Sequence, residues 1–239
     1  TLMYALGDYD PGALDANLIQ ERYLAAMQEK RLLPGDVANP DGMEHARFIE
    51  FLRGRGSNRM HIIGIHAATS EGKTQANIAG RASVLRILRF VRTLPGCEKA
   101  RLVRMMTETG IRETWRIVGE TSVTEADYTS GRVFEDAVSY SFYPIDLHTD
   151  HGTEIRPLAE GIVPTVPLRA LIPKGSRNLL IAGRSISSDR AANSALRVQA
   201  SCMAMGQAAG AAAALAVTGN LTPSQVPLTE LRELLKKHG

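Results

Sequence analysis

The sequence predicts an α+β protein in which helices and short strands alternate irregularly. Two stretches, residues 13–30 and 74–93, carry apolar residues at helical spacing, and Pro95 and Gly96 stop the second. A shorter helix is expected at 43–52. Short apolar runs bounded by Gly, Pro and polar residues are typical of strands, and they cover residues 60–66, 101–106, 114–118, 138–147 and 161–166.

The C-terminal segment has the most specific pattern. A strand at 178–182 runs into Gly183 and Arg184, and a long Ala-rich helix is expected over 194–217, with Gly219 at its left-handed cap. The N-terminus of this helix would point back at the strand end, which makes a corner that accepts an anion or presents a dipole. The small residues of the helix would let a flat group or another backbone approach closely, but tight helix–sheet packing would use them equally well.

Composition indicates an ordinary globular protein. The 239 residues are 44% apolar and 22% charged, and the net charge of +3 gives little support to nucleic-acid binding. Cys97 and Cys202 are too few for a disulfide scaffold and predict a reduced, cytoplasmic setting. The uncharged stretch between Arg197 and Glu230 is mostly Ala, so we expect a buried helix there and no membrane span.

One loop resembles a phosphate-binding loop. Gly72, Lys73 and Thr74 end a loose match to that pattern, placed between a predicted strand and a predicted helix. The loop holds a single glycine and Glu71 would repel an anion, which favours a plain helix N-terminus with Ser70 or Thr74 near the cap. A nucleotide-binding module remains the second functional hypothesis.

Arginines gather in two places. Arg112 and Arg116 would lie on one side of a strand together with Thr114, an arrangement that suits a carboxylate or another anion. An ion-pair network on an exposed sheet face is an equally good interpretation. A second row lies mostly off the apolar stripe of residues 74–93 and is typical of a solvated helix face: Arg81, Arg86, Arg89 and Arg92.

Other motifs of catalysis are weak. Alternation would place Asp146, His148 and Asp150 on one strand face, but no Cys or further His cluster completes a metal site, and a polar turn is favoured over a metal. The sequence has no GxGxxG after a strand. Its nearest approach, at residues 54–59, lacks the third Gly and precedes a predicted strand.

Residues 178–187 and 192–215 closely resemble the C-terminal flavin-binding tract of FAD-dependent oxidoreductases with the glutathione-reductase-like fold. Residues 110–120, 134–137 and 143–148 are similar to further landmarks of one subfamily, in the same order. The resemblance covers roughly residues 60–218, including the helix that follows the phosphate-loop lookalike.

This resemblance implies flavin hydride transfer with FAD as cofactor. It implies a mixed-sheet substrate-domain portion at 1–170 and a C-terminal FAD-binding segment at 171–239. The helix N-terminus around 194–198 would direct its dipole at the N1–C2=O edge of the flavin and stabilise the anionic reduced form. The candidates for binding an anionic substrate or transferring a proton are, by this resemblance, Arg112, Arg116 and His148. The implied cofactor-binding residues are Gly183, Arg184, Ser185, Ser194, Ala195, Leu196, Arg197 and Val198.

The sequence departs from the family in one large respect. It lacks the N-terminal βαβ unit, whose GxGxxG and ribose-binding acid hold the ADP half of FAD. We therefore expect the C-terminal part of a flavoenzyme, inactive without an N-terminal FAD-binding half. The expected partners are that half and a small substrate, for which an anion is one candidate class; a second copy of the chain is a further candidate, and no nucleic acid or membrane is expected. A non-catalytic fragment that self-associates through its cofactor face is the third hypothesis.

Overall fold

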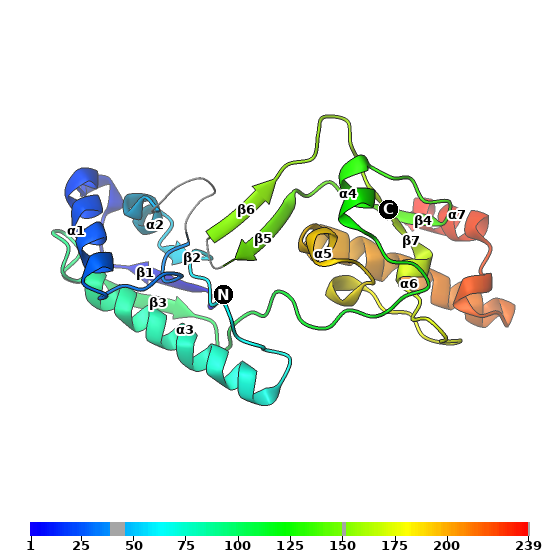
Figure 1. Ribbon diagram of the computed structural model, residues 1–239, viewed down its shortest axis with the longest axis horizontal. Helices are drawn as coiled ribbons and strands as arrows, with labels where there is room; N and C mark the ends of the chain where they lie inside the picture. Colours follow the sequence, from blue (N-terminus) through cyan, green and yellow to red (C-terminus); the bar gives the residue numbers. More distant parts are fainter. Residues whose placement is uncertain (39–45, 150–151, 239) are drawn as a thin grey trace. The chain divides into compact units, whose positions relative to one another are not determined.

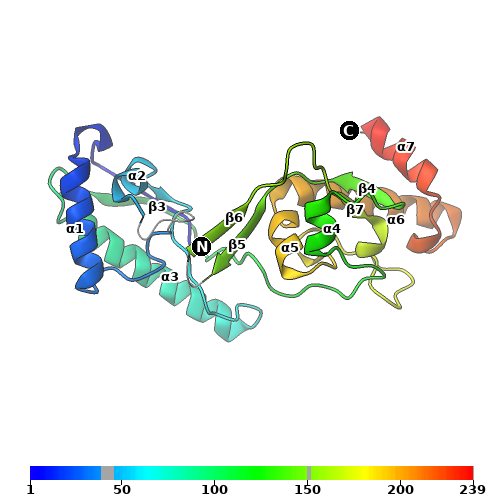
Figure 2. The same cartoon turned by 45° about the horizontal axis from the view of Figure 1, so that its top comes forward.

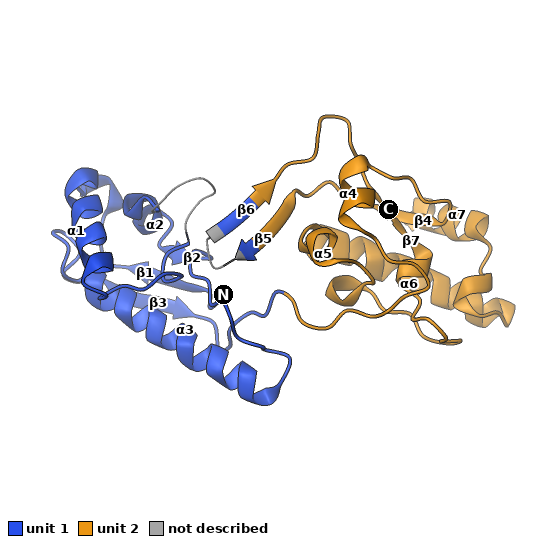
Figure 3. Cartoon of the chain, viewed as in Figure 1, with its two compact units in different colours: residues 1–112, 148–154 blue, residues 113–147, 155–239 orange. Residues whose placement is uncertain are grey.

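The computed structural model describes residues 1–38, 46–149 and 152–238 and confirms the α+β class. The chain forms two compact units, shown in Figure 3: Thr1–Arg112 with His148–Glu154, and Glu113–Leu147 with Ile155–Gly239. The predicted functional division at residue 170 concerns where the cofactor binds and stays a prediction.

The first unit is built on a small antiparallel sheet of order β2-β1-β3 (Figure 1). The strands are β1 (Tyr4–Gly7), β2 (Gly56–Ser57) and β3 (Arg101–Met105), and the helices are α1 (Ala16–Gln28), α2 (Phe48–Arg53) and α3 (Ser70–Val91), with a 3-10 turn at Pro11–Ala13. Phe48 lies at the centre of the core. Its ring is stacked 5.0 Å from both Tyr23 and Phe51 and meets the edge of Phe90 at 5.2 Å.

A buried carboxylate ties α3 to the rest of the first unit. Asp36 accepts hydrogen bonds from the Ser83 hydroxyl at 2.5 Å, the Leu33 N–H at 2.8 Å, and Arg86 Nε and Nη2 at 3.0 and 2.7 Å. Because every donor is in place, this buried charge is compensated.

The second unit packs helices against a short antiparallel pair, β4 (Ala137–Tyr140) and β7 (Thr165–Pro167). Its helices are α4 (Glu125–Ser130), α5 (Arg190–Leu196), α6 (Gln199–Gly219) and α7 (Leu228–His238), with 3-10 turns at Leu168–Ala170, Gly183–Ser185 and Pro223–Gln225. Helices α6 and α7 pack together, as Figure 1 and Figure 2 show. The ribbon of β5 (Ile145–Thr149) and β6 (Gly152–Arg156) contributes residues to both units.

Three predicted strands are wrong. Residues 60–66, 114–118 and 178–182 form no strand, because a strand needs a neighbour with which to share a ladder and none of the described residues provides one. Single bonds hold them instead, such as Ile181 N–H to the Leu171 carbonyl at 2.8 Å. The remaining predictions correspond to real strands with shifted bounds: 101–106 to β3, 138–147 to β4 and β5, and 161–166 to β7.

Helices were predicted better than strands. The stretches at 13–30 and 74–93 correspond to α1 and α3, and the one at 43–52 to the shorter α2, with 43–45 outside the described residues. The expected helix at 194–217 is two helices, since the chain breaks at Arg197 and Val198. Its left-handed cap is Asn220, with φ 53°, and Gly219 is still helical; Asn tolerates this conformation better than most residues.

Helix α6 is buried along one face only, through Ser201, Met205, Ala208, Ala212 and Ala216. Among the described helices, it alone is long and apolar enough by length and composition to cross a membrane. The core helix of a soluble protein passes the same test, so this is weak evidence.

The phosphate-loop lookalike is a helix N-terminus. The cap is Thr69, one residue before the predicted Ser70, and its hydroxyl accepts the Gly72 N–H at 3.0 Å. Gly72 is buried, and a Cβ there would lie 2.0 Å from the His66 carbonyl oxygen. The glycine therefore serves a close backbone contact, and Lys73 is exposed.

The close approach of Gly72 to the His66 carbonyl predicts the effect of a substitution at Gly72. Gly72→Ala should lower the free energy of unfolding by about 1–3 kcal/mol, because the methyl group overlaps backbone that cannot move aside cheaply. Lys73→Ala, the matched control, should change it by less than about 0.5 kcal/mol. Urea unfolding followed by circular dichroism measures both, and saturable ATP binding that Lys73→Ala abolishes would contradict this interpretation of the loop.

Candidate functional site

The turn before α5 has the backbone freedom that a close ligand needs. Gly183 has φ +80°, and a Cβ there would lie 3.8 Å from Cys202 Sγ on α6, so the space at this glycine is not crowded. The Arg184 side chain is exposed, while its carbonyl accepts the Asn193 amide at 3.1 Å. The Ser185 carbonyl accepts the Ile117 N–H at 2.9 Å.

The residues expected at a helix N-terminus lie instead in the second half of α5. Ser194, Ala195 and Leu196 are fully buried. The Ser194 hydroxyl donates to the Ala191 carbonyl at 2.7 Å and accepts the Asp146 N–H at 3.0 Å. The predicted start of the long helix at Ser194 therefore falls inside α5, while Val198, the last residue of the predicted range, is the N-cap of α6. The contact of these side chains with FAD stays a prediction.

Arg197 fixes the break between α5 and α6. Its guanidinium is 7% exposed and donates to the Asp146 and Ser194 carbonyls at 2.9 and 3.2 Å. Nη2 also lies 3.8 Å from Asp146 Oδ2. A charge so deeply buried needs these acceptors. The bonds to Asp146 fix the break between α5 and α6 next to β5.

The true helix N-terminus begins after Val198. The cap residue Val198 makes no side-chain cap hydrogen bond in the described structure, and the first turn of α6 carries no acid. The first-turn N–H groups of this 21-residue helix therefore present the positive end of its dipole. In the same segment, the buried Asn193 Oδ1 has no hydrogen-bond partner among the described residues. Free N–H donors and a glycine backbone are what the oxygen-rich FAD requires, so the residues fit that cofactor.

The first unit brings a second group of side chains together. Arg112 Nη1 lies 2.5 Å from His148 Nε2, and Arg112 Nη2 donates to Asn58 Oδ1 at 3.0 Å. His148 Nδ1 lies 3.1 Å from His61 Nδ1 and 3.3 Å from Thr153 Oγ1. The two rings meet edge to face at 4.3 Å.

These contacts determine where the His148 proton lies. A guanidinium only donates hydrogen bonds, so His148 Nε2 must accept from Arg112 and carries no proton. The ring proton of neutral His148 is then on Nδ1, facing His61 Nδ1. His61 Nδ1 and Thr153 Oγ1 both lie within reach of that proton, so a neutral His61 that accepts it carries its own proton on Nε2. The pair thus holds one proton between two facing nitrogens.

Arg116 does not join this group. It belongs to the second unit and lies 3.9 Å from Glu113, which also accepts from Arg190 at 3.1 Å. Residues 114–118 form no strand, so the expected shared face with Arg112 and Thr114 is wrong. The catalytic roles of Arg112, Arg116 and His148 stay predictions.

Sequence reasoning missed His61 and Asn58. Nothing in their local pattern distinguishes them, since Asn58 meets Arg112 and His61 meets His148, residues distant in the sequence. The described ranges contain no group of three or more His, Cys, Asp or Glu side chains that could hold a metal ion. Of the cluster considered earlier, Asp150 lies outside the described residues.

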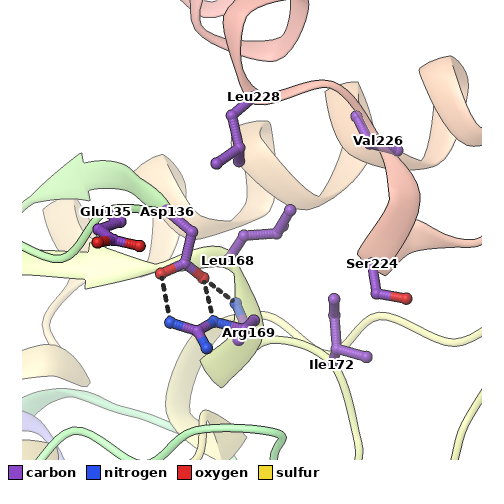
Figure 4. Close-up of a pocket in the computed structure, with 8 residues that line it drawn as sticks. All are labelled: Glu135, Asp136, Leu168, Arg169, Ile172, Ser224, Val226 and Leu228. Atoms are coloured by element: carbon purple, nitrogen blue, oxygen red, sulfur yellow. Dashed lines mark hydrogen bonds and ion pairs between the residues drawn. The ribbon is translucent and has the colours of Figure 1, made fainter.

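A cavity of about 240 Å³ in the second unit is shown in Figure 4. At its wall, Arg169 holds the buried Asp136 through Nε at 3.1 Å, Nη2 at 3.3 Å and its own backbone N–H at 2.9 Å. Asp136 raises the pKa of Arg169. The pair joins the 3-10 turn after β7 to the start of β4, and its acceptors are already occupied, so its role is structural.

The start of α6 and the turn at Gly183 have the features that an oxygen-rich cofactor requires. A family model described as FAD dependent oxidoreductase matches residues 1–235. The chain therefore belongs to the FAD-dependent oxidoreductases, and its cofactor is FAD. No curated protein and no solved structure matches it.

The histidine pair makes a spectroscopic prediction. In ¹⁵N-labelled protein near pH 8, His148 should show the Nδ1–H tautomer and His61 the Nε2–H tautomer, because Arg112 forces the assignment. Arg112→Gln should shift His148 toward a mixture of tautomers, while Arg104→Gln, at an exposed position of β3, should leave both rings unchanged. An Nε2–H tautomer for His148 in the unaltered chain would disprove the contact.

Proposed function

We propose that this chain supplies the flavin end of the FAD site in an oxidoreductase that works by flavin hydride transfer. The observation that carries the proposal is the uncapped N-terminus of α6 next to Gly183. Bound FAD supplies the hydride acceptor or donor. The chain supplies first-turn N–H groups that donate to the cofactor's oxygens, and a helix dipole that stabilises negative charge on the reduced ring.

The ADP half of FAD needs a separate dinucleotide-binding unit, because the sequence has no GxGxxG after a strand. The exposed face of α6 supports this proposal. A Cβ on Gly206 or Gly210 would meet nothing within 4 Å, so packing among the described residues does not explain these glycines. Met203 and Val217 are exposed on the same face, at 74% and 82%. Of the two interpretations of the small residues, close approach by another group is the better supported.

The first unit would serve the substrate. Arg112 is a planar guanidinium beside His148 and Asn58, and a side chain of this kind suits an anionic substrate. His148 and His61 would hold the proton that accompanies hydride transfer, at their facing Nδ1 atoms. A cytoplasmic setting stays a prediction; both cysteines are free thiols, as it requires.

Alanine substitutions at two glycines with the same φ angle test the proposed cofactor site. Gly183 and Gly175 both have φ +80°, so an alanine strains either one similarly. Gly183→Ala should weaken FAD binding by about tenfold or more, because it strains the glycine turn that we propose the cofactor approaches. Gly175→Ala, in open space, should bind as the unaltered chain does. FAD titration followed by visible absorbance measures both, and equal affinities would contradict the proposed corner.

The exposed glycines of α6 test the proposed close approach. Gly206→Ala and Gly210→Ala should each raise the free energy of unfolding by about 0.5–1 kcal/mol, since alanine is the better helix former and the space is open. Thermal unfolding measures this gain. Ala214→Gly on the same face is the reverse control and should lower stability by a similar amount. A loss of stability in both alanine variants would show that the glycines are already packed.

A further inference from the structure

Three of the four arginines in the row on α3 are bound to the fold. Arg81 donates to the Thr107 carbonyl at 2.6 Å, and Arg92 to the Ala100 carbonyl at 2.7 Å. Arg86 holds the buried Asp36. Arg89 is the exception: within the described ranges no hydrogen bond or ion pair to its side chain is found.

Arg89 lines a cavity of about 290 Å³ in the first unit. The other lining residues are Arg31, Arg86, Phe90 and Thr93. The guanidinium carbon of Arg31 lies 5.8 Å from the centre of the Phe90 ring, so an arginine and an aromatic ring share one wall. The Thr93 hydroxyl donates to the Phe90 carbonyl at 2.7 Å.

Positive charge exceeds negative charge around this cavity. Asp36, the partner of Arg86, is buried and already accepts from Ser83 and Leu33. Glu29, the partner of Arg31 at 2.6 Å, is exposed and binds one nitrogen of it. Each guanidinium has five N–H donors, so Arg31 and Arg86 keep donors beyond their ion pairs.

We propose that this cavity binds a small organic anion with at least two negative charges, carried by carboxylate or phosphate groups. Arginine forks bind both groups in the same planar way, and Phe90 with the arginine stems offers an apolar wall to the body of the ligand. A cavity of about 290 Å³ has room for about ten water-sized groups, enough for a metabolite the size of citrate. The site is independent of the proposed flavin corner, which belongs to the second unit.

Calorimetric titration of the full chain tests the proposal, with citrate and pyrophosphate as separate probes at constant ionic strength and acetate as the monovalent control. We expect saturable binding of at least one divalent or trivalent probe and none of acetate. The probe that binds more tightly identifies the anion as carboxylate or phosphate.

Arg89→Gln should weaken that binding by about tenfold, because it removes the guanidinium that is not committed to another partner. Arg104→Gln, which removes one exposed arginine of the same unit, should change the affinity less than about twofold. Arg89 is exposed, so its variant should fold normally, and circular dichroism checks this. Absence of saturable binding up to about 10 mM, or equal weakening by both variants, overturns the proposal.

Discussion

The buried guanidinium of Arg197 fixes the break between α5 and α6, where we propose that the cofactor binds. It lies where α5 ends and α6 begins, and it binds the Asp146 carbonyl at 2.9 Å while only 7% exposed. Without it, the carbonyls of Asp146 and Ser194 would lose their donor, and the start of α6 would lose its fixed position. The uncapped N-terminus of α6 and the turn at Gly183 are useful to a cofactor only because that position is fixed.

The sequence predicted much of the helical structure and little of the sheet. The patterns that predict α1 and α3 depend on neighbouring residues in the sequence, and the helices form as expected. The strand expected at 178–182 needed a neighbouring strand, and the local sequence does not show whether one is present. The sequence did not predict the break between α5 and α6 at Arg197, because the residues around it have an Ala-rich, helical pattern. The structure places Arg112 beside His148, two residues that the sequence proposed, whereas His61 could not be proposed because its contact with His148 joins segments distant in the sequence.

The two units serve the chemistry in different ways. The first brings a guanidinium and two histidines together, and we propose that these side chains bind and move charge. The second offers backbone, with free N–H groups at the start of a helix and a glycine in the left-handed region. Backbone donors are suited to a cofactor that stays in place, because they need no ordering when it binds. Hydrogen-bond donors on side chains can reorient, which suits a substrate whose charge changes during the reaction.

The most direct test compares FAD, FMN and ADP as ligands of the purified chain, with flavin binding followed by fluorescence quenching. A chain that holds only the flavin end of the cofactor should bind FAD and FMN with equal affinity, and excess ADP should displace neither. Displacement of FAD by ADP, or binding of FAD without any binding of FMN, would mean that the chain binds the ADP half of the cofactor. Either result would contradict the proposal that it binds the flavin end. So would the absence of flavin binding in a chain that circular dichroism shows to be folded.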